Sequence, residues 1–543
     1  MSIQIMTKVT PMNRLLSLMT MMAGTLLSVA PAWAAAPGIT STTATFNLTA
    51  QPASLNQPDG NQVYSWGYGC NSNSPQPGFL PAMPNQTCNT MQVPGPTLIV
   101  TEGQTVTVNL QNGLPAAAGN TSMLFPDFVM TTACPAANQG LLTCEALPGG
   151  SVTYKFVATT PGTHAYYSGT QSDLQIEMGL YGAIIVLPAT AQTACTTGVH
   201  ASNVTAQSSA SLAHPKVAET DFRLAKSAYD HPGSCYDREY LFQFAEMDLN
   251  IHRAALAQVT ANVSRLEVPT EPYHPNYFVI NGRSMPDDMD PNFDSVYPHQ
   301  PYNGNPHMHP GEDVLIRVIG QGHWQHPFHE HGNHVRILGR DGNLIQSATD
   351  PNSLAGPLLF TTTTTPGQAF DGIFYWTGRG LNWDAYGHTG SSSDPDLNAN
   401  LTCTPDANGY NTGLDGSAAS AGAPLAINYF EWCADHNKPL QAAPFGDVPG
   451  GGPITLPDAN IFANGAWYSG SPYLGPDATN RATGPNSAFQ PSNSQANPST
   501  ERGYAFMWHS HNEREITTNN VFPGGMFMMM LVDSREFVID ESN

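Results

Sequence analysis

Alternating apolar and polar positions mark short β-strands along most of the chain. Apolar residues recur at every second position in residues 105–110 (TVTVNL), and a similar segment, residues 313–318, follows Gly311 as the first follows Gly103. A period of two is typical of strands with one buried face. No helical periodicity extends beyond a few turns. The pattern predicts an all-β protein made of Greek-key β-sandwiches.

The same order of strands occurs twice, which predicts two β-sandwich modules. The opening and closing strands at 94–110 and 165–186 are matched by those at 311–318 and 507–532. Equivalent opening strands of the two modules are 208 residues apart in sequence (Gly103 to Gly311), but equivalent closing strands are 342 residues apart (Tyr167 to His509). The second module therefore contains a long insertion, which is rich in Gly, Ser, Asn and Pro. Such an insertion is typical of a functional lid, a partner surface or a partly disordered segment. We expect module 1 at 40–190, a linker at 191–234, module 2 at 235–540 and the insertion at about 380–502.

The first 34 residues have the order of a secretory signal peptide. Lys8 and Arg14 precede an apolar run at 15–30, and Ala32-Trp33-Ala34 follows it ahead of Ala35. We expect cleavage near Ala35 and export to the periplasm or the cell exterior. The alternative is an uncleaved anchor. No later segment has the roughly 18 consecutive apolar residues of a membrane-spanning helix, so none is expected in the mature chain.

The charge balance excludes several classes of partner. The chain has 19 Lys and Arg against 42 Asp and Glu, and the signal peptide removes two basic residues and no acidic ones. So acidic a surface repels phosphate backbones and anionic lipids, which argues against binding to nucleic acids or membrane surfaces.

All eight cysteines lie in the expected mature chain. An even number in an exported protein indicates disulfides, and we predict that neighbours in sequence pair, although many connectivities are open. No cysteine lies beside the histidine motifs described next, so no thiolate metal ligand is expected. The cysteines are Cys70, Cys88, Cys134, Cys144, Cys195, Cys235, Cys403 and Cys433.

Histidine is concentrated in one part of the second module. Eight of the 18 histidines fall between His299 and His334, and two His-x-His pairs stand at 329–331 and 509–511. Side chains two apart on a strand share a face, so two such strands can direct four imidazoles at one point. Neutral imidazole without thiolate favours copper, or else zinc. The alternative, that these are surface histidines, explains an isolated residue better than two pairs.

The motifs resemble those of the multicopper oxidases. Residues 311–334 resemble the ligand strand of that family's last cupredoxin domain, and residues 508–511 (WHSH) resemble its terminal His-Cys-His motif. Residues 94–97 (PGPT), Gly103 and residues 179–182 (GLYG) resemble its first domain, so the resemblance spans about residues 46–532 apart from the linker and insertion. It implies cupredoxin domains in which a blue copper takes electrons from a substrate. The cysteine then carries them to a trinuclear copper cluster that reduces dioxygen to water.

The resemblance also implies roles for individual residues. His329 corresponds to a type 2 copper ligand, and His331, His509 and His511 correspond to type 3 ligands. His326 corresponds to a blue-copper ligand.

The sequence departs from this family at the blue-copper position. Ser510 stands where the family has its cysteine, and a hydroxyl cannot replace the copper–thiolate bond. Glu515 stands where the family has another blue-copper histidine, and Met526 is the remnant of an axial ligand. The sequence therefore predicts no blue copper centre.

The first module departs at the trinuclear positions. Leu124 and Pro126 replace one expected His-x-His pair, and Tyr167 and Gly169 replace the other. Half of the cluster's ligands are thus missing, and a homo-oligomer of this chain would not supply them. We expect one copper ion, or two at partial occupancy, bound by some of the four histidines of the second module.

Further residues near the histidine pairs are candidates for supporting roles. Tyr167 is expected to face the metal from the first module, and His323 and His334 are expected to orient its ligands. His307 and His309 form a third pair, which we interpret as a polar loop rather than a second metal-capture site. Methionines 526 and 528–530 are assigned to core packing rather than copper(I) binding.

Three functions remain open. The first is an exported copper-binding protein that has lost the blue centre. The second is an unusual copper-dependent oxidoreductase that uses the remaining histidines. The third is a structural protein with a vestigial site, whose insertion binds a partner protein or another copy. No Ser-His-Asp, paired-carboxylate or phosphate-loop motif supports another chemistry.

Overall fold

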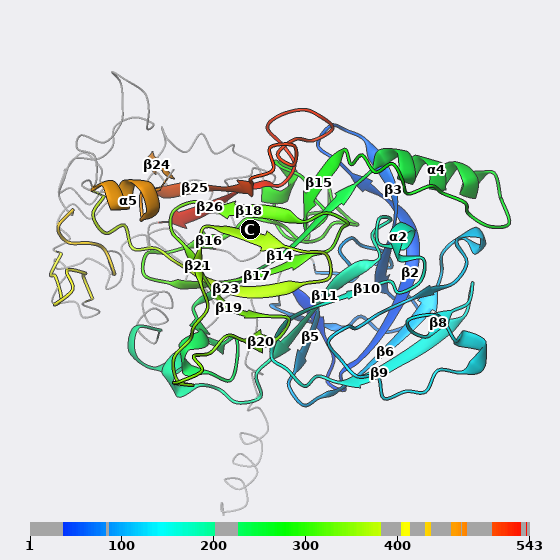
Figure 1. Cartoon of the computed structure of the whole chain (residues 1–543), viewed down its shortest axis with the longest axis horizontal. Coiled ribbons are helices and arrows are strands. Elements are labelled where there is room, and N and C mark those ends of the chain that lie inside the picture. The colour runs from blue at the N-terminus through cyan, green and yellow to red at the C-terminus, as the bar shows by residue number, and fades with distance from the viewer. Residues whose placement is uncertain are drawn as a thin grey trace, which may run out of the picture. The chain divides into compact units, whose positions relative to one another are not determined.

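The computed structural model confirms the all-β prediction (Figure 1). Residues 33–543 form one compact unit. No helix among the described residues is long and apolar enough to span a membrane. The expected signal peptide, most of the linker and much of the insertion lie outside the described residues. Those residues are 36–82, 86–200, 226–381, 403–412, 429–435, 458–468, 470–474, 502–533 and 539.

Two main sheets are built from the first part of the chain. One has the order β10-β11-β5-β1-β4 and the other the order β3-β2-β6-β9. Leu48 and Val108 from the second sheet pack against Ile184 from the first in a single core. The strands are β1 (Gly38–Thr40), β2 (Thr45–Asn56), β3 (Gln62–Cys70), β4 (Gly78–Leu80), β5 (Leu98–Thr101), β6 (Thr105–Asn112), β9 (Ser151–Val157), β10 (Gly162–Tyr167) and β11 (Tyr181–Leu187).

Two larger sheets follow. One has the order β15-β14-β17-β23-β19-β20 with β21 beside β19, and the other the order β16-β26-β25-β18-β22 with β24 beside β25. Val318 of the first packs with Phe328 and Trp508 of the second. The strands are β14 (Arg238–Met247), β15 (Tyr277–Ile280), β16 (His307–Met308), β17 (Asp313–Gly320), β18 (His326–Glu330), β19 (Val335–Arg340), β20 (Asn343–Leu344), β21 (Leu358–Leu359), β22 (Thr361–Thr364), β23 (Ala369–Tyr375), β24 (Gly470–Leu474), β25 (Arg502–Ser510) and β26 (Phe527–Asp533).

The two halves repeat one topology. In β3-β2-β6-β9 the successive pairings are antiparallel, parallel and antiparallel. The order β15-β14-β17-β23 has the same three pairings. β10 with β11 also corresponds to β25 with β26, and in each case the second strand has a parallel neighbour that precedes it in the chain. The repeat read from the sequence is therefore a repeat of strand order.

Helices are few, and the longest was not expected from the sequence. Asp248 caps α4 (Leu249–Thr260) by accepting a hydrogen bond from the Asn250 amide. Ile251 and Ala255 then pack into the core of the first pair of sheets. The other elements are β7 (Thr121–Ser122), β8 (Glu145–Ala146), β12 (Lys226–Ser227), β13 (Cys235–Tyr236), α2 (Ser172–Gln175), α5 (Ala459–Asn464), η1 (Ala116–Ala118), η2 (Ala136–Asn138), η3 (Thr193–Thr196), η4 (Pro232–Ser234) and η5 (Asp287–Met289).

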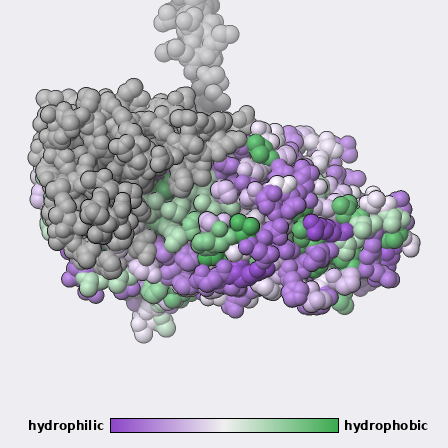
Figure 2. Space-filling view, turned by 90° about the horizontal axis from the view of Figure 1, so that it is seen from above, coloured by the Kyte–Doolittle hydropathy of each residue, from purple (hydrophilic) through white to green (hydrophobic). Residues whose placement is uncertain are grey.

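Two further predictions are confirmed. The eight cysteines pair with their sequence neighbours, as Cys70–Cys88, Cys134–Cys144, Cys195–Cys235 and Cys403–Cys433. Met526, Met528 and Met530 are fully buried in the core of the second pair of sheets, as expected for packing. On the face seen in Figure 2, the described surface is mostly hydrophilic, with small hydrophobic patches.

A buried polar junction joins the two halves. Arg317 of β17 forms an ion pair with Glu239 of β14, and its Nη1 lies 3.2 Å from Oδ1 of Asp371 in β23. The same Nη1 donates to the hydroxyl of Thr163 in β10, at 3.0 Å. Tyr229 donates to Oδ2 of Asp371 at 2.6 Å. Because all these groups are buried, the carboxylates depend on Arg317 for their compensation.

We therefore predict that Arg317→Ala destabilises the protein by about 3–5 kcal/mol, since it leaves Glu239 and Asp371 buried without their cation. Urea unfolding followed by tryptophan fluorescence measures this. Arg265→Ala removes an exposed arginine and is the control, with an expected change within about 0.5 kcal/mol. Equal effects of the two substitutions would contradict the role given to Arg317.

Candidate metal centre

The pairing of β18 with β25 brings the two His-x-His pairs together. The strands are antiparallel, and His329 lies directly opposite His509. The ladder continues past the strand end, where the His511 amide donates to the Pro327 carbonyl at 2.7 Å. Because side chains alternate along a strand, Phe328 turns into the core while His329 lies on the other face. The predicted meeting of the two pairs is therefore present.

The four imidazoles form a compact group, which we call the four-histidine cluster: His329, His331, His509 and His511. Ring centroids of His329 lie 4.8 Å from His331, 5.7 Å from His509 and 4.7 Å from His511. His509 lies 5.2 Å from His331 and 5.5 Å from His511.

Hydrogen bonds orient two of these rings. Nδ1 of His509 lies 2.8 Å from the carbonyl oxygen of Ser510, so it carries the proton, and Nε2 keeps its lone pair. Nδ1 of His329 lies 2.6 Å from the Thr361 hydroxyl, and its Nε2 lies 3.0 Å from the Tyr468 hydroxyl. Such bonds to the second ring nitrogen are typical of metal-binding histidines.

Burial favours the neutral form of two cluster members, His329 and His509. Burial and the neighbouring imidazoles lower the pKa of His329 to about 3. Burial also lowers the pKa of His509. The side chain of His511 is 52% exposed and forms the solvent-facing side of the site. Metal binding requires neutral imidazole, and the lowered pKa values of His329 and His509 favour that form.

The ring spacing fits one ion. For metal–nitrogen bonds of about 2.0 Å in tetrahedral geometry, imidazole centroids are about 5 Å apart, close to the spacings found here. Among the described residues, however, no three of the four histidines have donor atoms within 4.8 Å of one another. The rings must therefore turn to present their nitrogens to one ion. With nitrogen donors and no thiolate, copper and zinc fit this donor set.

A separate buried network surrounds His326. Its Nε2 lies 3.0 Å from Oε2 of Glu246, and its Nδ1 lies 2.9 Å from Oε2 of Glu515. Ser510 donates to the same oxygen of Glu515 at 2.5 Å. Burial alone would lower the pKa of His326, but the two carboxylates raise it to about 9. His326 is therefore an imidazolium held between two carboxylates.

The residues matched to the blue-copper site by sequence do converge. The Ser510 amide donates to the Met526 carbonyl at 3.0 Å, and the Met526 amide donates to the Glu515 carbonyl at 2.8 Å. With His326 they form one buried group. Each ring nitrogen of His326 lies within hydrogen-bonding distance of a carboxylate oxygen, although the Nδ1 contact with Glu515 is an ion pair and not an aligned hydrogen bond. The imidazolium form has no lone pair to offer a metal.

Other predicted residues lie elsewhere. His323 packs against Tyr273, and its amide donates to Glu246 at 2.5 Å, so it borders the His326 network rather than the cluster. His334 contacts Phe360, whose ring stands 5.6 Å from that of His329. His334 thus reaches the cluster only through a phenyl ring.

The third His-x-His pair is not a loop. His307 begins the short strand β16, and its Nδ1 lies 2.7 Å from a carboxylate oxygen of Asp533. Nδ1 of His309 lies 2.8 Å from the Asp533 carbonyl. The pair therefore ties β16 to the end of β26, which corrects the expectation of a polar loop.

The corresponding strands of the first half meet in the same way without histidines. Leu124 bridges Tyr167, with the Leu124 amide donating to the Tyr167 carbonyl at 2.7 Å, as His329 opposes His509 in the second half. Pro126 and Gly169 follow two residues later, as the second histidines do. Tyr167 lines a cavity of about 270 Å³ with Gln321 and His323, and no contact of Tyr167 with the cluster is found in the described residues.

Sequence reasoning missed three residues of these sites. Tyr468 comes from the insertion, just before β24, and Thr361 begins β22. Glu246 lies 80 residues before His326. No local motif marks them, because each arrives through long-range strand pairing. Only Glu246 carried a signal, as a carboxylate in an otherwise apolar strand segment.

Comparison with known proteins identifies part of the chain. Residues 82–191 match the family described as multicopper oxidase. An L-ascorbate oxidase of Brassica rapa subsp. pekinensis is 33% identical over 97 residues, which is 18% of this chain and 16% of that protein. Multicopper oxidase MCE of Talaromyces pinophilus is 36% identical over 98 residues, 18% of this chain and 15% of its own length. The alignments thus span about a sixth of these relatives.

Among solved structures, the blue copper oxidase of Nitrosomonas europaea aligns with 90% of this chain and 85% of its own, at 14% identity and a TM-score of 0.43. The sequence match with the family falls on the half whose strands lack the histidine pairs, and His164 is the single histidine in that stretch. Its Nδ1 lies 2.9 Å from Asp127. Residues 82–191 are therefore similar to the multicopper oxidase family, and the described part of the chain is mostly β-strand.

Proposed function

We propose that this chain is an exported copper-binding protein of the multicopper oxidase family. Its four-histidine cluster holds one copper ion, with zinc as the competing metal, and no blue copper centre is present. The observation that carries the proposal is the register of β18 and β25, which opposes His329 to His509 and groups four imidazoles at a spacing suited to one ion. The four disulfides and the N-terminal sequence support export.

The His326 network supports the absence of a blue centre. Such a centre requires a thiolate and a neutral imidazole nitrogen for the metal. Here Ser510 offers a hydroxyl that donates to Glu515, and His326 is charged between two carboxylates. The imidazolium supplies positive charge at this buried position, and the carboxylates compensate it. Electron transfer through a copper–thiolate bond is therefore not part of the proposed function.

Individual residues of the cluster then have separate tasks. The Ser510 carbonyl and the Thr361 hydroxyl hold the rings of His509 and His329 in place. The Tyr468 hydroxyl is hydrogen-bonded to Nε2 of His329 and would be displaced when a metal binds that nitrogen. His511 stands at the exposed side, where an ion enters from solvent. Copper supplies a Lewis-acid and redox-capable centre when bound.

We predict that the purified full-length protein binds one Cu(II) at the four-histidine cluster, and that His329→Ala/His509→Ala lowers the copper content by one ion per chain. Each single substitution weakens binding on the order of 100-fold, because one ligand and its orientation are lost. Metal analysis after equilibrium dialysis measures the stoichiometry. Copper also raises the melting temperature of the wild type, since a ligand of the native state stabilises it.

The matched control is His274→Ala, which removes an exposed histidine outside both sites. It should bind copper as the wild type does. An unchanged melting temperature and no retained copper in the wild type would instead favour a structural protein with a vestigial site.

The second prediction concerns the replaced blue-copper position. Ser510→Cys/Glu515→His places a thiolate and a second imidazole beside His326 and Met526. Removing Glu515 also frees Nδ1 of His326, while Glu246 remains on Nε2 as an outer partner. After copper loading, this variant should show an intense thiolate-to-copper absorption in the red, which the wild type lacks.

Ser510→Ala/Glu515→His is the control, because it changes the same two positions without a thiol and should stay colourless in the red. If the copper-loaded wild type itself showed the band, the proposal of a protein without a blue centre would be wrong.

A copper-dependent oxidoreductase is the second candidate function, and Tyr468 favours it. Its phenol lies 3.0 Å from a nitrogen of the cluster, where a redox-active side chain can take part in chemistry. This function predicts oxygen consumption by the copper-loaded protein with phenols or Mn(II). His509→Ala and His511→Ala would abolish it, and Tyr468→Phe would slow it while copper binding persists. An oxygen electrode measures the rates. No consumption with any substrate would leave the binding protein as the function.

A further inference from the structure

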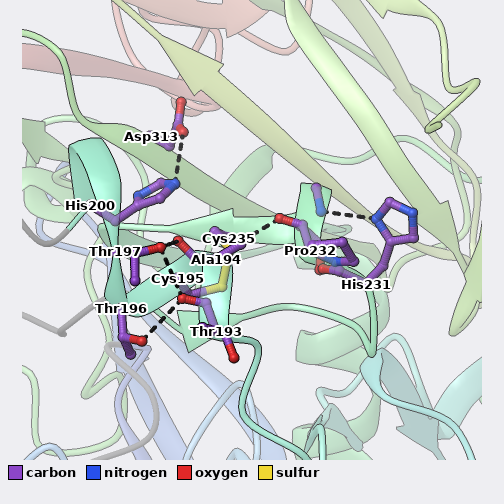
Figure 3. The surroundings of a disulfide bond; sticks show 12 residues. Thr193, Ala194, Cys195, Thr196, Thr197, His200, His231, Pro232, Cys235 and Asp313 are labelled. Carbon is purple, nitrogen blue, oxygen red and sulfur yellow. Dashed lines mark hydrogen bonds and ion pairs between the residues drawn. A yellow bond between two sulfur atoms is a disulfide. The ribbon is translucent and has the colours of Figure 1, made fainter. Parts of the chain in front are cut away.

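Three ionisable groups outside the four-histidine cluster converge where the linker meets the second pair of sheets. Nδ1 of His200 lies 2.9 Å from Oδ1 of Asp237, and its Nε2 lies 3.7 Å from Oδ2 of Asp313. Figure 3 shows the imidazole of His200 pointing at Asp313. Among the described residues, these three form the one set of histidine, cysteine or acidic groups whose donor atoms all lie within 4.8 Å.

Strand pairing fixes the two aspartates. Asp237 directly precedes β14, and Asp313 begins β17, its parallel neighbour, so both lie at the same end of the sheet. The Asp313 amide donates to Oδ2 of Asp237 at 2.8 Å, and the Asp237 amide donates to the Asp313 carbonyl at 2.8 Å. The carboxylates are therefore held side by side by the backbone.

A disulfide fixes the histidine. Cys195 bonds to Cys235 with a Cα–Cα distance of 5.2 Å, and this bond ties the start of the linker to the residue two before Asp237. His200 follows Cys195 by five residues, so the disulfide keeps the His200 side chain near the start of β14 (Figure 3). The donor groups are thus pre-positioned by a covalent bond and a strand pair. Pre-positioned ligands reduce the entropy lost when an ion binds.

The charges at this point favour a cation. Two carboxylates stand together, and burial and Asp237 raise the pKa of Asp313 to about 7. Glu312 lies close by but has its own cation, because its Oε2 lies 2.6 Å from Nε of Arg238. His200 is the basic group shared by the two aspartates. Unlike the contacts of His326, the 3.7 Å contact of His200 Nε2 with Asp313 is too long for a hydrogen bond, so a divalent ion can take the place of a proton there and compensate both carboxylates.

We propose that His200, Asp237 and Asp313 bind a divalent cation of the zinc class, independently of the four-histidine cluster. One imidazole with two carboxylates suits Zn²⁺, whose usual ligands are histidine nitrogen and carboxylate oxygen; Ca²⁺ and Mg²⁺ prefer all-oxygen sites. The Asp313 side chain is 30% exposed, so an ion can enter and keep a water ligand. The ion links the linker to β14 and β17.

The experiment uses the full chain with Zn²⁺ as the probe, in a His329→Ala/His509→Ala background in which the four-histidine cluster is disabled. Equilibrium dialysis with metal analysis counts the bound zinc. One zinc per chain is expected in this background, with binding weakened on the order of 100-fold by His200→Ala or Asp313→Asn. Zinc should also raise the melting temperature of the background variant and leave that of the two further variants nearly unchanged.

His274→Ala in the same background controls for the loss of any histidine, and Asp313→Asn keeps the side-chain shape so that folding is preserved. If His200→Ala and Asp313→Asn bound zinc as tightly as the background protein, or if the background protein bound none, the three groups would be an ion pair bridged by a proton and the proposal would be overturned. Because the cluster is disabled throughout, this result does not depend on the proposed copper site.

Discussion

The antiparallel register of β18 and β25 is the constraint on which the four-histidine cluster depends. Side chains alternate along a strand, so a slip of β18 by one residue would turn His329 into the core and bring Phe328 to the face that carries His509. β22 holds β18 from its other side, and β26 and β24 hold β25. The positions of the imidazoles are therefore set by backbone hydrogen bonds across a whole sheet.

The same register governs the buried charge beside the cluster. Ser510 lies between the two histidines of its strand, so its side chain must point to the opposite face, where it meets Glu515 and His326. A charge in the protein interior is tolerated only with compensation, and here an imidazolium and two carboxylates provide it for each other. The two faces of β25 thus carry different chemistry: neutral imidazoles on one side and an ion-pair network on the other.

The sequence predicted the features that depend on local pattern. Strand periodicity, the two His-x-His pairs and the pairing of neighbouring cysteines are all readable over short stretches, and the structure has them. It did not predict Glu246 beside His326 or Tyr468 beside His329, because these partners are 80 and 139 residues apart and meet only after the sheets form. The helix α4 was missed because it spans only 12 residues, although its capping Asp248 was a usable signal. Tyr167 was expected at the metal because its strand corresponds to that of His509, but it packs among residues of both halves, such as Ile185 and Ile319, and lines a separate cavity.

The two halves place side chains of different chemistry at equivalent positions of the fold. Leu124 opposes Tyr167 in the first half as His329 opposes His509 in the second, and the strand order around both pairs is the same. Backbone geometry alone therefore provides two places where four side chains can meet, and only the identity of those side chains decides whether a metal can be held. An apolar residue and a tyrosine make the first place a packing contact. The second place has imidazoles, and burial favours the neutral form of His329 and His509. Substitution of such side chains can create or remove a metal site without any change of fold.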